Sequence, residues 1–303
     1  MTETGLIEPH VPTPKPRQER VPLGILYMLG ATVMFSASSA VSKWLIGTYP
    51  AGEILFTRSF VSLVACSLFV LPHTGLSVFR TARVRDHLFR GISQTTSQTC
   101  LIIAFSMMPL AGAIAINFSA PLFATIAAIF LFHEKVGRPR WAALLVGFLG
   151  VVVITNPGTG AFQLGSLFAL ANAILYGTVT AAVRGMSATE SAETLTMYQM
   201  VFLTSLFALG LPLGIVVPDW KDGLLLFFNG LGNGLGQYWW TRSLHLAPAS
   251  AVGPFYYFSL VWAIILGFLL WGDWPTLSLI AGSAIVVGSG LVLLWHESRA
   301  RPV

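Results

Sequence analysis

Long apolar stretches separated by short polar or proline-containing connections dominate the amino-acid sequence. Each stretch holds about 20 residues, which as an α-helix is long enough to cross a hydrocarbon layer roughly 30 Å thick. Prolines fall between most of the stretches, where a missing backbone N–H group is tolerated. The pattern predicts ten transmembrane helices, at residues 21–46, 53–71, 88–108, 111–133, 140–155, 164–184, 193–217, 223–246, 249–271 and 276–295.

The second half of the sequence resembles the first. Residues 91–134 align without a gap on residues 230–273 at an offset of 139, so that Gln98 falls on Gln237. Spans 1–5 match spans 6–10, and because five is odd, the second unit must enter the membrane from the opposite side. Two such units enclose a shared cavity near the bilayer midplane, as is typical of transporters. Chance similarity between apolar helices is the alternative explanation.

The predicted fold is an all-α membrane protein with ten transmembrane helices in two inverted five-helix repeats around a central cavity. We place a proline-rich cytoplasmic tail at 1–20, the first repeat at 21–158, the second at 159–297 and a short cytoplasmic tail at 298–303. The first tail is too polar to bury a core and is expected to be mobile. No cleavable leader pattern precedes the first span, which predicts a retained anchor.

Composition and charge agree with this prediction. Apolar residues make up 55% of the chain, charged residues 10%, and the mean hydropathy is +0.75. Most of the 17 Lys and Arg residues fall on the side that holds both termini, the exceptions being Lys43, Arg58 and Lys221. The positive-inside rule then predicts cytoplasmic termini. The net charge of +5 is explained by topology, and nucleic-acid binding is not expected.

Motifs for other functions are missing or find a simpler explanation. Cys66 and Cys100 lie inside spans, which favours buried free thiols over a disulfide or metal site. The glycine-rich stretch at 230–236 has no preceding strand, and so we interpret it as a close helix contact rather than a phosphate loop. No catalytic constellation is visible, and neither an enzyme nor a cofactor is predicted.

The chain resembles the drug/metabolite transporter superfamily in its EamA-type branch. The resemblance depends on the five-plus-five span pattern, on small residues after Pro109 and Pro248, and on the acidic Glu134 and Asp273 that close spans 4 and 9. It implies a multi-pass protein of the bacterial inner membrane, monomeric or homodimeric, that moves a small molecule. Among its members the sequence is most similar to bacterial exporters of amino acids, including aromatic ones, and of related metabolites.

Polar residues at helical spacing mark the predicted cavity. A polar group in a span has no water to bond in the lipid, and it therefore turns toward protein or a wet cavity. The candidates combine amides with deep aromatic side chains: Gln94, Gln98, Asn117, Asn172, Tyr176, Asn233, Gln237, Trp240 and Tyr256. Interhelical hydrogen bonding is the competing explanation for each amide. Spans 5 and 10 carry almost no interior polar residue and are predicted to serve as scaffold or dimer contact.

The placement of charge suggests a mechanism. No Asp or Glu lies in the middle of a predicted span, which favours uncoupled, facilitated export by alternating access over proton coupling. Arg58 is the deepest charge; we expect it to pair with Glu53 and extend toward the interface, attraction of a substrate carboxylate being the alternative. A proton-coupled efflux carrier for drugs or sugar-type metabolites, or a membrane channel, are the other candidate functions.

Overall fold

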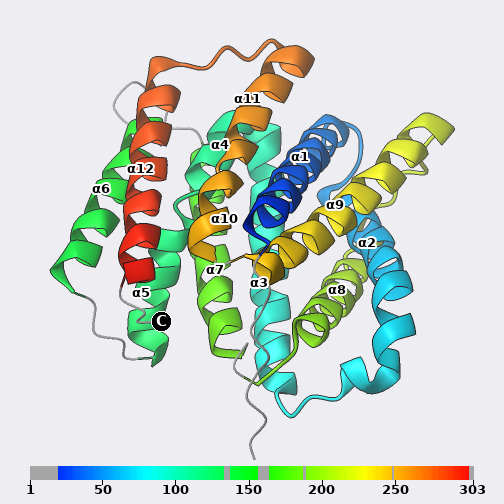
Figure 1. Cartoon of the computed structure of the whole chain (residues 1–303). Helices are drawn as coiled ribbons and strands as arrows, with labels where there is room; N and C mark the ends of the chain where they lie inside the picture. Colours follow the sequence, from blue (N-terminus) through cyan, green and yellow to red (C-terminus); the bar gives the residue numbers. More distant parts are fainter. Residues whose placement is uncertain (1–19, 133–136, 156–163, 187–188, 248, 300–303) are drawn as a thin grey trace, which may run out of the picture.

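The computed structural model describes residues 20–132, 137–155, 164–186, 189–247 and 249–299. The predicted tails at 1–20 and 298–303 lie almost entirely outside these residues, as do Glu134 and Pro248. The described segments are helical and contain no strand (Figure 1). In chain order they are α1 (Val21–Leu45), α2 (Ala51–Thr74), the 3₁₀ helix η1 (Gly75–Phe79), α3 (Val84–Met107), α4 (Leu110–Asn117), α5 (Ala120–Phe132), α6 (Arg138–Thr155), α7 (Leu164–Met186), α8 (Ala192–Ala208), η2 (Leu211–Leu213), α9 (Trp220–Leu246), α10 (Ala249–Tyr256), α11 (Phe258–Trp271) and α12 (Leu277–Arg299).

Five helical stretches are long and apolar enough to cross a membrane: Val21–Leu45, Ala51–Phe79, Leu110–Ala127, Leu164–Val183 and Pro254–Trp271. Two shorter apolar stretches are Trp141–Thr155 and Leu277–Val292. Helices α3, α8 and α9 are not among the helices long and apolar enough to span a membrane. Helices α3 and α9 carry most of the amides, and α8 has only 17 residues. By length and composition alone, the structure thus establishes fewer spans than the ten predicted.

Spans 4 and 9, predicted as continuous, are each broken into two helices. The first break lies at Phe118–Ser119, between α4 and α5, and the second at Tyr257, between α10 and α11. Pro121 at the start of α5 and Pro254 inside α10 lack the N–H group that a continuous helix needs, and their rings crowd the preceding turn. The two breaks are 139 residues apart, the offset that aligns the two halves of the sequence.

The ends of α2 and α8 also differ from the prediction, and a proline lies near each of them. Pro72 lies inside α2, close to its end, whereas it was expected between spans. The seventh span ends at Ala208 instead of residue 217, and Pro212 lies in η2 beyond it.

Helices at matching places in the two halves pack against matching partners. Helix α1 packs along α9, and α7 packs along α3; α2 packs on α9, and α8 packs on α3. Helices α6 and α12 pair with each other at one side of the bundle (Figure 1). Every residue of α4 from Leu110 to Ile116 is buried, which places this short helix in the core.

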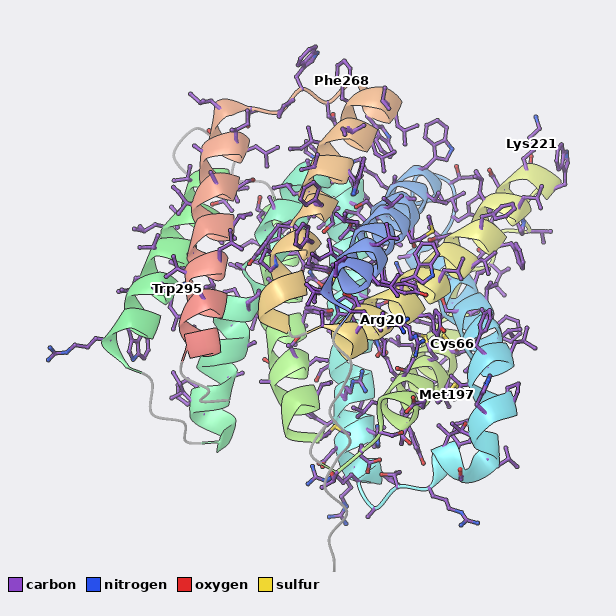
Figure 2. All side chains as sticks on the ribbon, in the orientation of Figure 1. Arg20, Cys66, Met197, Lys221, Phe268 and Trp295 are labelled. Atoms are coloured by element: carbon purple, nitrogen blue, oxygen red, sulfur yellow. The ribbon has the colours of Figure 1, made fainter. Side chains whose placement is uncertain are left out.

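The outside of the bundle is apolar. Leu68, Phe130 and Leu269 are 71%, 76% and 68% exposed, respectively. Figure 2 shows Phe268 and Trp295 at the periphery, while Cys66 and Met197 belong to a buried cluster between α2 and α8. Apolar side chains in this number on an exterior are suited to lipid rather than water.

The glycine-rich stretch of α9 is a packing surface, as predicted. A Cβ atom on Gly230 would lie 2.5 Å from Val61 Cβ, and one on Gly236 would lie 2.9 Å from Phe35 Cε1. At Gly234 the nearest atom would be Ser62 Cα, at 3.3 Å. The missing side chains let α9 approach α1 and α2 closely, which brings polar residues on these helices within hydrogen-bonding distance.

Gly230→Ala should destabilise the protein by about 1–3 kcal/mol, because the new methyl group overlaps Val61 and the backbone of α2. Gly223→Ala in the same helix is the matched control, since a Cβ there meets nothing within 4 Å. Thermal unfolding in detergent measures both. Equal midpoints for the two variants would contradict the close contact between α9 and α2.

Candidate functional site

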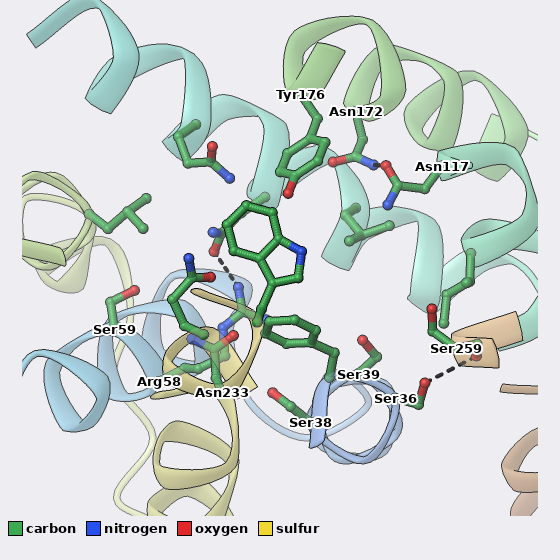
Figure 3. Close-up of a pocket in the computed structure, with 18 of the residues that line it drawn as sticks. Ser36, Ser38, Ser39, Arg58, Ser59, Asn117, Asn172, Tyr176, Asn233 and Ser259 are labelled. Carbon is green, nitrogen blue, oxygen red and sulfur yellow. Dashed lines mark hydrogen bonds between the residues drawn. The ribbon is translucent and has the colours of Figure 1, made fainter. Parts of the chain in front are cut away.

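A cavity of about 160 Å³ lies among the helices, and all nine predicted site residues line it. Helices α1, α2, α3, α4, α7, α8, α9, α10 and α11 contribute to its wall, whereas no described residue of α5, α6 or α12 does. The residues come from places far apart in the sequence, and the fold brings them together (Figure 3). Their role in binding a substrate remains a prediction.

On one wall, a hydroxyl and two amides are linked by hydrogen bonds. The Ser97 hydroxyl donates to Asn172 Oδ1 over 2.8 Å, and Asn172 Nδ2 donates to Asn117 Oδ1 over 2.8 Å. Figure 3 shows Asn172 and Asn117 side by side, with Tyr176 near them. Since each amide has a fixed partner, the wall presents its polar atoms to the cavity in one arrangement.

The opposite wall is built on α9. Asn233 Nδ2 donates to Ser62 Oγ over 3.0 Å, and the Ser62 hydroxyl donates to the Gly230 carbonyl over 2.8 Å. Asn233, Gln237 and Trp240 follow one another at helical spacing on α9, and all three line the cavity. Asn229 does not: it is 1% exposed, accepts from the Ser38 hydroxyl over 2.5 Å and donates to Ser42 Oγ over 3.0 Å. For Asn229 the interhelical explanation holds.

The two helix breaks lie on the cavity wall. Phe118 and Tyr256 both line the cavity, and their rings meet edge to face with centroids 5.9 Å apart. Ser259, at the start of α11, offers its carbonyl to the Ser36 hydroxyl over 3.0 Å, a contact that joins α11 to α1 (Figure 3). Broken helices leave backbone groups without helical partners, and irregular backbone in a membrane is tolerated where it borders a cavity.

Arg58 was predicted to pair with Glu53 and extend toward the interface, and this prediction is wrong. Its side chain lines the cavity, and its guanidinium donates to Gln98 Oε1 (Figure 3). Glu53 instead accepts from the backbone N–H of Val216 over 3.0 Å.

A second arginine, Arg90, lies within a helix rather than in a loop. Arg90 was counted with the cytoplasmic loops, but it is buried within α3 and donates to the Leu195 carbonyl over 2.8 Å. It also donates to Gln199 Oε1 over 2.5 Å, and Gln199 lines the cavity. Ser59 and Gln199 are further lining residues absent from the prediction.

No group of three or more His, Cys, Asp or Glu residues that could hold a metal ion occurs in the described part of the chain. Among the described residues, the hydrogen-bond donors around the cavity are amides, hydroxyls, the Trp240 indole and one guanidinium. Such groups recognise an organic solute by hydrogen bonds.

An apolar helical bundle around a buried polar chamber defines a membrane protein with a solute-sized site. The chain belongs to the EamA-like transporter family, which matches it twice, at residues 22–156 and 163–295. The resemblance to the drug/metabolite transporter superfamily is thereby confirmed. The protein is a membrane transporter for small molecules and not an enzyme.

Several bacterial transporters are similar over nearly their whole length. A riboflavin transporter from Rhizobium johnstonii is 28% identical over 283 residues, which cover 92% of this chain and 93% of that protein. An S-adenosylmethionine uptake transporter from Rickettsia conorii is 26% identical over 278 residues (91% and 94%). A pseudopaline exporter from Pseudomonas aeruginosa is 28% identical over 278 residues (89% and 95%). A solved crystal structure with 21% identity superposes with a TM-score of 0.63, covers 92% of this chain and 99% of that chain, and shows the same fold.

Asn229→Ala and Ser42→Ala should each lower stability, and a double-mutant cycle should give a coupling of about 0.6–1.7 kcal/mol for their hydrogen bond. Unfolding of the purified protein in mixed micelles measures the cycle. Additive effects of the two substitutions would contradict an energetically significant contact between α1 and α9.

Proposed function

We propose that the protein is a secondary carrier that works by alternating access between two inverted five-helix units, residues 21–158 and 159–297. The double family match, the two helix breaks 139 residues apart and the matching helix contacts support this arrangement. Two related units can rock around a site between them, which exposes the site to one side of the membrane at a time. In this proposal each unit has five transmembrane spans, ten in all.

The residues of the cavity wall support a proposal for the class of substrate. Seven amides supply hydrogen-bond donors and acceptors, while Tyr176, Trp240 and Tyr256 supply aromatic surface. A wall of this kind suits a small amphipathic solute. We propose export of small metabolites, amino acids with aromatic or other apolar side chains being the leading class. Riboflavin and S-adenosylmethionine, named for two relatives, also combine an aromatic ring system with polar groups.

The proposed location is the bacterial inner membrane, with both termini cytoplasmic. The support is the uneven distribution of Lys and Arg between the two sides. The paired helices α6 and α12 expose Leu145 and Ile280 at the edge of the bundle, away from the cavity, and this edge is the proposed scaffold or homodimer contact.

Gln237→Ala and Gln98→Ala should each reduce transport at least about fivefold, because each removes a polar group from the cavity wall. Counterflow of a labelled amino acid in proteoliposomes measures transport, and recovery of the protein in the membrane fraction measures insertion. Thr96→Ala is the control, since this side chain is exposed on α3 and bonds only its own helix. Wild-type flux in both glutamine variants would remove these amides from the mechanism.

The same assay separates the candidate classes, because a carrier saturates and shows counterflow, whereas a channel does neither. If none of a panel of amino acids, flavins, sugars and cationic drugs showed saturable counterflow, the proposed function would be refuted.

Flux should not change by more than about twofold when a pH gradient is imposed across the proteoliposome membrane. The reason is that no carboxylate lies among the described residues of the cavity wall, where a proton relay is expected. Strong dependence on the gradient would favour the alternative, a proton-coupled efflux carrier for drugs or sugar-type metabolites.

A further inference from the structure

A buried arginine faces the cavity without an acidic partner among the residues described there. Arg58 is 9% exposed and lines the cavity, and the described wall contains no Asp or Glu. Glu53, on the same helix, is engaged by the backbone N–H of Val216. Within the described residues, Gln98 supplies the acceptor for the guanidinium.

Among the described residues, most N–H groups of the Arg58 guanidinium have no hydrogen-bond acceptor. Arginine carries five N–H donors in a planar fork, and a single amide oxygen does not occupy them. Burial of a cation is costly unless an anion or several hydrogen bonds compensate it. A residue that is charged, buried and directed into a solute cavity therefore indicates an anionic group on the solute.

We propose that Arg58 binds a carboxylate of the transported solute. The proposal rests on the proposed function, because it assigns the chemistry of one end of the substrate in the same cavity. Arginine and carboxylate match in geometry, since two parallel N–H groups meet two coplanar oxygens. The bound solute then supplies the negative charge that the cavity wall lacks.

The rest of the wall restricts the solute to one negative charge. A phosphate monoester carries close to two charges at neutral pH, and one guanidinium would leave a charge uncompensated in a buried site. The remaining polar groups are neutral amides and hydroxyls, and the aromatic rings of Tyr176 and Trp240 offer apolar contact. The class that fits is an aromatic compound with a single carboxylate, with or without an amino group.

Gln98 gives the site a way to respond to binding. Its amide oxygen is neutral, and a carboxylate is the stronger acceptor for a guanidinium. When the solute carboxylate takes its place, the hydrogen bond between α2 and α3 breaks. Binding of the carboxylate therefore loosens one contact between two helices of the cavity wall, as a moving carrier requires.

The test uses pairs of ligands that differ only in charge: indole-3-acetate and indole-3-acetamide, N-acetyl-L-tryptophan and its amide, and benzoate and benzamide. Binding to the purified full-length protein is measured by microscale thermophoresis and by inhibition of counterflow. We expect the carboxylate of at least one pair to bind at least about tenfold more tightly than its amide. In Arg58→Gln this ratio should fall to about one, and in Arg58→Lys it should be intermediate.

Arg80→Gln is the charge-matched control, because Arg80 is exposed after η1 and is not one of the residues that line the cavity; it should keep the wild-type ratio. Comparable melting of the Arg58 variants and the wild type shows that they are folded, and the carboxylate-to-amide ratio within one variant is independent of its total amount. Equal affinities within all three pairs would overturn the proposal, as would tighter binding of phenyl phosphate than of benzoate. If saturable counterflow of a neutral solute such as riboflavin survives in Arg58→Gln while no pair shows a preference, the inference fails and the carrier function stands.

Discussion

A polar side chain inside this bundle cannot form hydrogen bonds with the surrounding lipid, and this constraint determines where the polar residues of the site lie. Hydrocarbon offers no hydrogen bonds, so that each amide must pair across a helix contact or face a cavity. Asn229 takes the first course and ties α9 to α1. Gln237 takes the second, on the same helix, and lines the cavity. Asn172 does both, since it links Ser97 to Asn117 and still borders the cavity.

Close helix packing makes these hydrogen bonds possible. Gly230 and Gly234 remove side chains from α9 where α2 crosses it, and Ser62 of α2 can then bond both the Gly230 carbonyl and the amide of Asn233. The small residues therefore act on the site indirectly, by setting how far its wall helices stand apart. The helix breaks act more directly, because they place Phe118 and Tyr256 on the wall.

Sequence patterns predicted the helices and six of the seven lining amides because both follow from local spacing. The stripe of Asn233, Gln237 and Trp240 requires only that span 8 be helical, and the structure places all three at one cavity. Arg58 escaped prediction because its two possible environments, interface and cavity, differ only in how α2 packs. The helix breaks escaped because Pro121 and Pro254 lie inside apolar runs that otherwise appear continuous.

The two halves of the chain have similar helices but different side chains at matching positions, and these differences can give the cavity its specificity. The offset of 140 that aligns Glu53 with Glu193 also aligns Arg58 with Tyr198 and Ser59 with Gln199. Ser59 and Gln199 both line the cavity, whereas Tyr198 stacks on His87 with centroids 4.2 Å apart and donates to the Phe79 carbonyl over 2.8 Å. One matched position therefore holds a cation at the cavity and its counterpart holds a packed ring outside it. Two related units can surround a cavity between them. Among the described residues of its wall, the guanidinium of Arg58 gives this cavity one charged end, and the rest of the wall is aromatic and lined by amides. If Arg58 binds the solute carboxylate as proposed, a solute with one charged group binds in one orientation.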